Sequence, residues 1–305
     1  MIKTLAKSIR QYKRESILSP ILVTLEVLLE CLIPLYMSKM LEGIKQEPTM
    51  NNILIYGAIL LVMAAFSLLF GMLAGKYAAT ASAGFARNLR HDIYYKIQDF
   101  SFSNIDKFST SSLVTRMTTD VTNIQMAYMM IDRVAFRSPV MMIVSLAMTY
   151  SINWQMELVF TALVPILGVG LILIFKKVDP IFSKVFKKYD ALNESIQENI
   201  KGIRVVKSYV REDYEIKKFD KAAEDVRVDF TRGEKIIALN NPLMQLCMWT
   251  AITLICFIGS VIVMQSVEEA LNSSDLMILI VYASQTLSSL TMLSMDMVMI
   301  SIAKT

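Results

Sequence analysis

Long stretches without a charged residue are the feature that most constrains this chain. Five such stretches occur, and a helix needs about 20 mostly apolar residues to cross the hydrocarbon core of a bilayer. They lie between Glu47 and Lys76, Arg137 and Glu157, Glu157 and Lys176, Lys235 and Glu268, and Asp275 and Asp296. Each stretch predicts one membrane-spanning helix.

A sixth span is predicted between Glu15 and Lys39, where the apolar run contains only two charged residues, Glu26 and Glu30. These glutamates are four residues apart and therefore share one face of a helix. The chain of 305 residues is 54% hydrophobic and 19% charged, whereas soluble domains are about 45–50% apolar and about 25% charged. We expect an all-α integral membrane protein with six spans, at roughly 17–40, 53–76, 133–152, 156–177, 236–264 and 275–300.

Basic residues are concentrated on one side of these spans. The segments before the first span, between the second and third, and between the fourth and fifth together contain 28 of the 31 lysines and arginines. Cytoplasmic segments beside spans keep the positive charge, so both termini are predicted to be cytoplasmic. The net charge of +4 reflects this topology, and no nucleic-acid partner is expected.

The two cytoplasmic connections, roughly 77–132 and 178–235, are much longer than the outer loops. Segments of that length without secondary structure are uncommon. Phe182, Phe186 and Tyr189 begin a spacing of three and four residues that is typical of an amphipathic helix. Each connection is therefore predicted to be a helical hairpin with a short transverse helix at its tip. In the second tip, that helix is expected to begin near Glu212 or Asp213, because acidic residues favour helix N-termini.

Several long motifs in these hairpins resemble the transmembrane domain of type I ABC exporters. In the first hairpin they are Phe85 to Arg90, Phe100 to Phe108 and Leu113 to Val121. In the second they are Leu192 to Glu212 with Phe219 and Asp220. The similarity extends along the whole chain and includes Arg137 to Pro139 and Asn241 to Met244. The chain is similar to half-transporters of bacterial heterodimeric multidrug-type exporters.

The resemblance implies the ABC transporter type 1 transmembrane fold, with six spans in each of two halves and coupling helices at the hairpin tips that dock onto nucleotide-binding domains. The residues it places at these contacts are Phe108, Ser109, Thr110, Ser111, Ser112, Leu113 and Val114 in the first tip, and Tyr209, Val210, Arg211, Glu212, Asp213, Tyr214, Glu215 and Ile216 in the second. The expected partners are a second half-transporter, a different chain in preference to an identical one, a nucleotide-binding domain, the lipid bilayer and a small amphipathic substrate. The expected location is the bacterial plasma (inner) membrane.

No ATPase motif is present in the sequence. The run nearest to a phosphate-binding GxxxxGK[ST] loop is Gly71 to Lys76, and Tyr77 follows it where a Ser or Thr should bind magnesium. No cofactor is therefore expected in this chain, and ATP and Mg²⁺ are implied for the nucleotide-binding domain of the complete, ATP-hydrolysing transporter. The sequence is expected to be part of a longer chain, with a lone permease domain served by a separate ATPase chain as the alternative.

Ionisable and flexible residues inside the spans are the candidates for a substrate cavity. They are Glu26, Glu30, Met292, Met295, Asp296 and Met299. A charged residue at the bilayer centre costs about 2.5–3.5 kcal/mol, so Glu26 and Glu30 should face the bundle interior or a watery cavity. They either line the cavity and favour cationic or amphipathic cargo, or they pair with a base across the dimer or lie near the interface as a packing feature. The methionines either line a cavity that adapts to different ligands or face lipid and neighbouring helices.

Four other charged residues, Arg116, Asp120, Arg133 and Arg137, are expected to form salt bridges that hold the first hairpin together. The only histidine is His91, so a His-based metal site is not expected.

Two other classes of function are considered. A secondary transporter usually has discontinuous helices at the membrane midplane, and it would leave the cytoplasmic hairpins unexplained. A non-transporting membrane scaffold or receptor would lack a polar cavity, and Glu26 and Glu30 argue mildly against that class.

Overall fold

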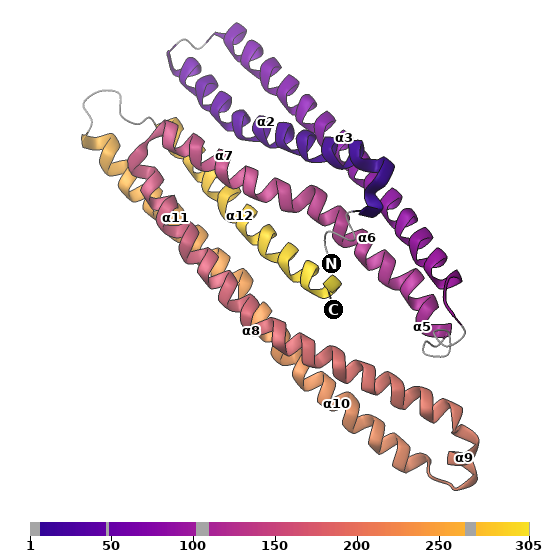
Figure 1. Ribbon diagram of the computed structural model, residues 1–305. Coiled ribbons are helices and arrows are strands. Elements are labelled where there is room, and N and C mark those ends of the chain that lie inside the picture. The colour runs from indigo at the N-terminus through magenta and orange to yellow at the C-terminus, as the bar shows by residue number, and fades with distance from the viewer. Residues whose placement is uncertain (1–6, 47–48, 102–109, 266–272, 305) are drawn as a thin grey trace. The chain divides into compact units, whose positions relative to one another are not determined.

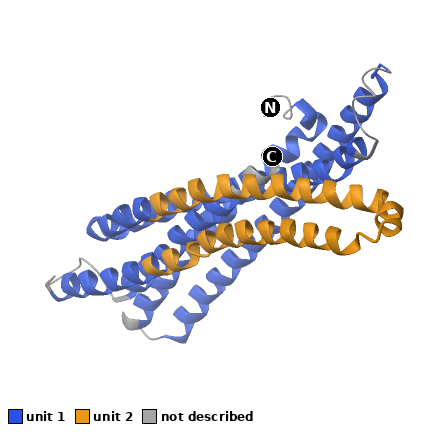
Figure 2. Cartoon of the chain, turned by 90° about the horizontal axis from the view of Figure 1, so that it is seen from below, with its two compact units in different colours: residues 1–166, 247–304 blue, residues 167–246, 305 orange. Residues whose placement is uncertain are grey.

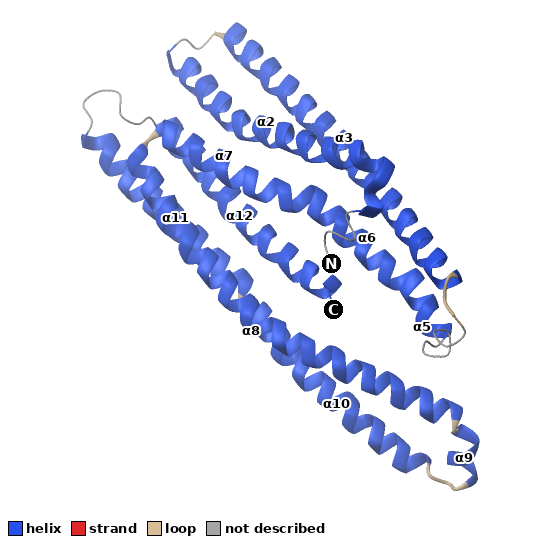
Figure 3. Ribbon diagram, in the orientation of Figure 1, coloured by secondary structure: helices blue, strands red, loops and turns tan. Residues whose placement is uncertain are grey.

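The computed structural model describes residues 7–46, 49–101, 110–265 and 273–304, and these residues form helices and their connections (Figure 1, Figure 3). In chain order the helices are η1 (Lys7–Tyr12), α2 (Lys13–Gln46), α3 (Met50–Gln98), α5 (Thr110–Thr115), η2 (Arg116–Asp120), α6 (Val121–Met130), η3 (Ile131–Ala135), α7 (Phe136–Ile152), α8 (Trp154–Lys201), α9 (Ile203–Ser208), α10 (Glu212–Ile237), α11 (Asn240–Gln265) and α12 (Ser273–Lys304). The short η1 is a 3-10 helix, whereas η2 and η3 are π-helical turns within a longer helical run.

Six helical runs are long and apolar enough to cross a membrane. They are Lys7–Ile44, Met50–Gln98, Ser112–Ile152, Trp154–Lys201, Glu212–Met264 and Ser274–Met297. One predicted span falls on each run. Four of the runs continue well beyond their apolar parts and form the two predicted hairpins. The prediction of an all-α membrane fold with six spans and two long hairpins is therefore confirmed.

The chain divides into two compact units (Figure 2). The first unit consists of residues 1–166 and 247–304, and the second consists of residues 167–246. The boundaries fall inside α8 and α11, so both helices run from one unit into the other.

The core of the first unit lies where α2, α7 and α12 pack together. Two polar contacts join these helices among apolar side chains. The hydroxyl of Tyr282 donates a hydrogen bond of 2.6 Å to the backbone carbonyl of Cys31, and the hydroxyl oxygens of Ser145 and Thr286 are 2.7 Å apart. Because lipid supplies no hydrogen-bond partner, such groups in spanning helices pair with one another.

The N-terminal helix η1 packs against the part of α3 that belongs to the first hairpin. Arg10 Nη2 lies 2.6 Å from Asp92 Oδ1, and the hydroxyl of Ser8 donates to Asp92 Oδ2 at 2.9 Å. Gly84 permits this close approach, since a Cβ added there would lie 2.3 Å from the ring of Tyr12.

The arms of the first hairpin, α3 and α6, share a buried apolar cluster. It is built from Phe85, Ala86 and Leu89 of α3 and Val121 of α6. The rings of Phe85 and Tyr128 stack with their centroids 4.7 Å apart. The cluster joins the two arms outside the apolar parts of the spans.

The second unit contains the hairpin of α8 and α10, with α9 at its tip. The rings of Phe182 and Phe230 meet edge to face with centroids 5.6 Å apart. Phe182 also lies over Gly233, where an added Cβ would be 2.7 Å from its ring. Lys188 Nζ lies 2.6 Å from Asp229 Oδ2, and this hydrogen bond lowers the pKa of the Asp229 carboxyl. Aromatic packing and this ion pair thus connect the arms, and nearer the tip Asn199 Nδ2 donates a hydrogen bond of 2.9 Å to Glu215 Oε2.

The second tip differs from its prediction. The sequence predicts a short helix that begins near Glu212, whereas the short helix α9 occupies Ile203–Ser208 and the long α10 begins at Glu212. The reason is that α8 ends before Gly202. The short helix α9 therefore follows directly, and the chain reverses direction only after it. The turn that follows contains Val210, whose φ is 52°.

We predict that Gly84→Ala lowers the free energy of unfolding by about 1–3 kcal/mol, because its methyl group would overlap the ring of Tyr12. Thermal unfolding in detergent measures this effect. Gly57→Ala on the same helix is the matched control, since nothing lies within 4 Å of its added Cβ. In a Tyr12→Ala background, Gly84→Ala should cost little further stability, because the ring that its methyl group would overlap is gone. Equal melting temperatures for the two alanine variants would contradict this packing.

Candidate functional site

An ion triad lies in the membrane-spanning parts of α2 and α7. Arg137 Nη1 lies 2.7 Å from Glu26 Oε1, and Arg137 Nη2 lies 2.8 Å and 2.7 Å from Oε1 and Oε2 of Glu30. The side chains of Glu26, Arg137 and Glu30 are 11%, 26% and 28% exposed. With both carboxylates charged, the triad has one net negative charge.

Helix periodicity and helix packing bring the triad together. Glu26 and Glu30 lie one turn apart on α2, which packs against α7. The planar guanidinium of Arg137 presents several N–H donors in a fixed fork, so it can bind two carboxylates at once. The base that pairs with both glutamates therefore comes from this same chain.

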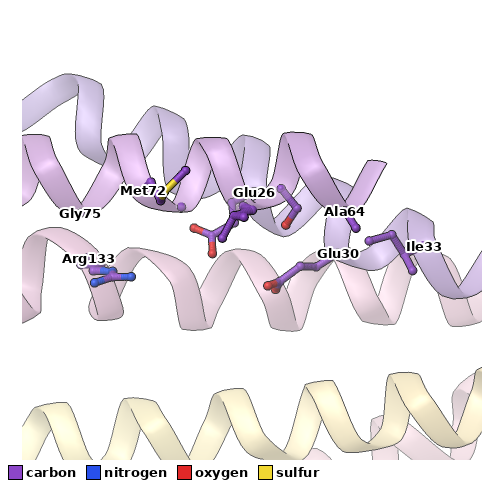
Figure 4. A pocket seen from close by; sticks show the side chains of 10 residues that line it. Glu26, Glu30, Ile33, Ala64, Met72, Gly75 and Arg133 are labelled. Carbon is purple, nitrogen blue, oxygen red and sulfur yellow. The ribbon is translucent and has the colours of Figure 1, made fainter. Parts of the chain in front are cut away.

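A pocket of about 610 Å³ borders the triad (Figure 4). Its walls come from α2, α3 and η3. The α3 wall contains Ala64, Ser67, Gly71 and Gly75, small residues that recur at three and four along one helix face. A Cβ added at Gly71 would lie only 2.9 Å from Glu26 Oε1, so this glycine lets the carboxylate lie against the backbone of α3.

Two charged side chains of the pocket, Glu26 and Arg133, lack a hydrogen-bond or salt-bridge partner at one of their groups among the described residues. Glu26 is 8% exposed, and its Oε2 atom has no hydrogen-bond partner in the described part of the chain. Arg133 of η3 has no carboxylate within salt-bridge distance among the described residues. A Cβ added at Gly75 would lie 3.7 Å from Arg133 Nη1. Figure 4 shows Arg133 beside Gly75 at one end of the pocket, with Glu26 and then Glu30 further along.

Of the candidates predicted in the sixth span, Met292, Met295 and Asp296 do not line this pocket. Asp296 of α12 is 5% exposed, and its Oδ2 atom has no hydrogen-bond partner within the described residues. Met292 and Met295 are exposed, and the side chain of Met299 lies outside the described residues. The structure thus places Glu26 and Glu30 at one pocket that Met292, Met295 and Asp296 do not line.

The predicted coupling residues that the structure describes lie at the ends of the hairpins. In the first tip, Phe108 and Ser109 lie outside the described residues, Thr110 and Ser111 begin α5, Ser112 and Leu113 are half-buried, and Val114 is exposed. In the second tip, Tyr209, Val210, Arg211, Asp213, Tyr214 and Ile216 are exposed, whereas Glu212 and Glu215 are half-buried. Large apolar side chains gathered on an exposed surface are typical of a site that contacts another protein.

For Arg137, the prediction of a salt bridge within the first hairpin is wrong. Its carboxylate partners belong to α2, because α7 packs against that helix at this level. The matching four-residue spacings of Arg133 with Arg137 and of Glu26 with Glu30 do not signal this pairing, because both glutamates bind Arg137 and neither binds Arg133. The sequence reasoning also missed Gly71 and Gly75, whose importance depends on what lies opposite them.

Comparison with known proteins agrees with this architecture. The chain matches the family described as ABC transporter transmembrane region over residues 16–290, which is most of its length. The chain belongs to this family.

Three relatives of this ABC transporter transmembrane region come from bacteria. An uncharacterized ABC transporter ATP-binding protein of Bacillus subtilis (strain 168), YfiB, is 28% identical over 272 residues, which cover 89% of this chain and 47% of the relative. YknU of the same strain, described in the same words, is 34% identical over 180 residues, or 58% of this chain and 30% of the relative. An ATP-dependent lipid A-core flippase of Pseudomonas fluorescens (strain Pf0-1) is 26% identical over 200 residues, or 66% and 33%. The matched region is less than half the length of each.

We predict that Arg137→Gln lowers the free energy of unfolding by about 3–5 kcal/mol, because it leaves two carboxylates inside a span without a base. Thermal unfolding in detergent measures the loss, and Arg87→Gln, at an exposed position on α3, is the control. Combining Arg137→Gln with Glu26→Gln and Glu30→Gln should recover much of the stability, since neutral amides need no counter-charge. A melting temperature unchanged by Arg137→Gln would rule out a structural role for the triad.

Proposed function

We propose that this chain is the transmembrane half of an ATP-driven exporter that moves amphipathic compounds by alternating access. Its membership in the ABC transporter transmembrane family carries the proposal. The two long hairpins support it, because a protein that needed only a path through the bilayer would have no use for helices that extend so far beyond the spans.

In this proposal the energy comes from a nucleotide-binding domain, in a longer form of this chain or in a separate chain. YfiB, for example, is named an ATP-binding protein, and the region that matches this chain accounts for 47% of the length of YfiB. The exposed apolar side chains of the second tip, including Tyr209 and Val210, dock onto that domain. Because each hairpin is continuous with its spans, movement at the tip is transmitted as rigid-body movement of the helices.

The arrangement in the membrane is also part of the proposal. Both termini and both hairpins lie on the cytoplasmic side of a bacterial plasma membrane, as the distribution of lysine and arginine favours. A second half-transporter, different from this chain, completes the substrate path.

The coupling role of the second tip predicts that Val210→Asp lowers substrate-stimulated ATP hydrolysis by the complete transporter about tenfold. The physical reason is that a carboxylate at an apolar docking contact would be desolvated without a partner. Stability should not fall, because Val210 is 82% exposed and Asp tolerates its φ of 52° better than a branched side chain does. Glu194→Ala, at an exposed position on the arm α8, is the control. If substrate still stimulates ATP hydrolysis fully in Val210→Asp, the second tip faces water and does not dock onto a nucleotide-binding domain.

The function itself is tested with the complete transporter in inside-out vesicles. We expect ATP-dependent uptake of a fluorescent amphipathic dye that vanadate blocks and that a proton ionophore leaves intact. Loss of uptake with the ionophore alone would indicate a secondary transporter. Absence of any nucleotide-dependent or ligand-dependent response would indicate a scaffold.

A further inference from the structure

We propose that the pocket between α2, α3 and η3 binds a zwitterionic amphiphile, with a primary ammonium group at Glu26 and an anionic group such as a phosphate at Arg133. This inference names a substrate class for the proposed exporter. The claim that the ligand is transported rests on the proposed exporter function, whereas the claim that it binds does not. The binding itself can be measured without ATP.

The acidic end of the pocket lacks a hydrogen-bond donor. Glu26 Oε1 accepts from Arg137 at 2.7 Å, whereas Glu26 Oε2 is buried and has no partner within the described residues. A buried, charged acceptor that remains unpaired is unfavourable. A ligand that supplies an N–H group at Oε2 would remove this penalty. A primary ammonium has three such donors, whereas a quaternary ammonium has none.

The charges around the pocket disfavour a ligand that is only cationic. Arg137 already binds both glutamates, and Arg133 lines the same pocket. With these four side chains ionised, their charges sum to zero. A purely cationic ligand would meet two glutamates that already share Arg137. It would also be repelled by the guanidinium of Arg133, which has no carboxylate partner among the described residues. Glu26 and Glu30 considered alone would favour a cationic ligand. The two arginines remove that preference.

The basic end of the pocket suits an anion. Arg133 has no carboxylate partner within the described residues, and a guanidinium binds phosphate through two parallel hydrogen bonds. Gly71 lies against Glu26, and Gly75 lies next to Arg133. These glycines are four residues apart on α3, so the two ends of the pocket are separated by about 6 Å along the helix axis. The ammonium and the anion must therefore be close together in the ligand, as in ethanolamine phosphate.

The rest of the wall is apolar. Ile33, Leu68 and Met72 line the pocket, and Leu68 and Met72 are also exposed at its open side. Such a wall suits a hydrocarbon tail that leaves the pocket toward the bilayer, and the thioether of Met72 adapts to different tails. The proposed ligand is therefore an amphiphile with the headgroup chemistry of phosphatidylethanolamine.

The first test is calorimetric titration of the complete transporter in detergent with a short-chain phosphatidylethanolamine. The phosphatidylcholine and phosphatidylglycerol with the same chains, and ethanolamine phosphate without chains, are titrated in parallel. We expect phosphatidylethanolamine to bind at least tenfold more tightly than each of the other three. Equal affinities for the three lipids would overturn the proposal, and so would equal affinities for phosphatidylethanolamine and free ethanolamine phosphate.

Variants then locate the binding site. Arg133→Gln should weaken phosphatidylethanolamine binding about tenfold, whereas Arg87→Gln, an exposed arginine on α3 outside the pocket, should not change it. Gly71→Ala should also weaken binding, because its Cβ would lie 2.9 Å from Glu26 Oε1, whereas Gly57→Ala on the same helix adds a methyl group in open space. Arg133 is exposed and unpaired among the described residues, so its variant should keep the parent melting temperature. Parent-like affinity in Arg133→Gln would overturn the assignment of this pocket.

Transport in vesicles separates this inference from the proposed function. If vanadate-sensitive transport is absent but Arg133→Gln still loses lipid binding, the exporter function fails and the site stands. If transport is present and Arg133→Gln binds the lipid as the parent does, the exporter function stands and the site fails.

Discussion

The hydrocarbon interior of a bilayer has no hydrogen-bonding partner to offer, and every polar group in the spans of this chain must satisfy that constraint. Long helices satisfy the backbone. Some side chains follow the same rule: Ser145 and Thr286 share a hydrogen bond, and Tyr282 donates to the carbonyl of Cys31. Glu26 Oε2 and Asp296 Oδ2 are exceptions, since they have no partner among the described residues. Where the chain carries full charges into a span, a counter-charge has to come from another helix, and Arg137 supplies it.

The triad connects the packing of the helices with the proposed binding site, because one carboxylate belongs to both. Glu26 Oε1 belongs to the ion pair that connects α2 with α7, whereas Oε2 is left without a donor beside a pocket. Small residues on α3 provide the room for this arrangement, since a side chain at Gly71 would push against the carboxylate. A charge pair that only stabilised the helices would need neither the open volume nor a second arginine, Arg133, at the far end of the pocket.

The hairpins meet a different requirement, because outside the bilayer water can satisfy their polar groups. Their arms are held by aromatic contacts, Phe85 with Tyr128 in one hairpin and Phe182 with Phe230 in the other. The second tip keeps Val210 exposed and at a positive φ, where a branched side chain is unfavourable. Backbone strain of this kind is concentrated at functional sites, which agrees with the docking role proposed for the tip.

Local patterns were sufficient to predict the six spans and both hairpins, because hydropathy, charge placement and helical spacing are read within short windows of the chain. The family was predicted separately, from the resemblance of long motifs in the hairpins to known exporters. Local patterns could not predict where the short helix of the second tip lies. That helix begins just after Gly202, whereas the acidic residues Glu212 and Asp213 lie at the start of the long α10. They also left open whether Glu26 pairs, lines a cavity or does both. Arg137 is 111 residues away from it in the chain, and only the packing of α2, α3 and α7 decides which charges meet and where a pocket remains.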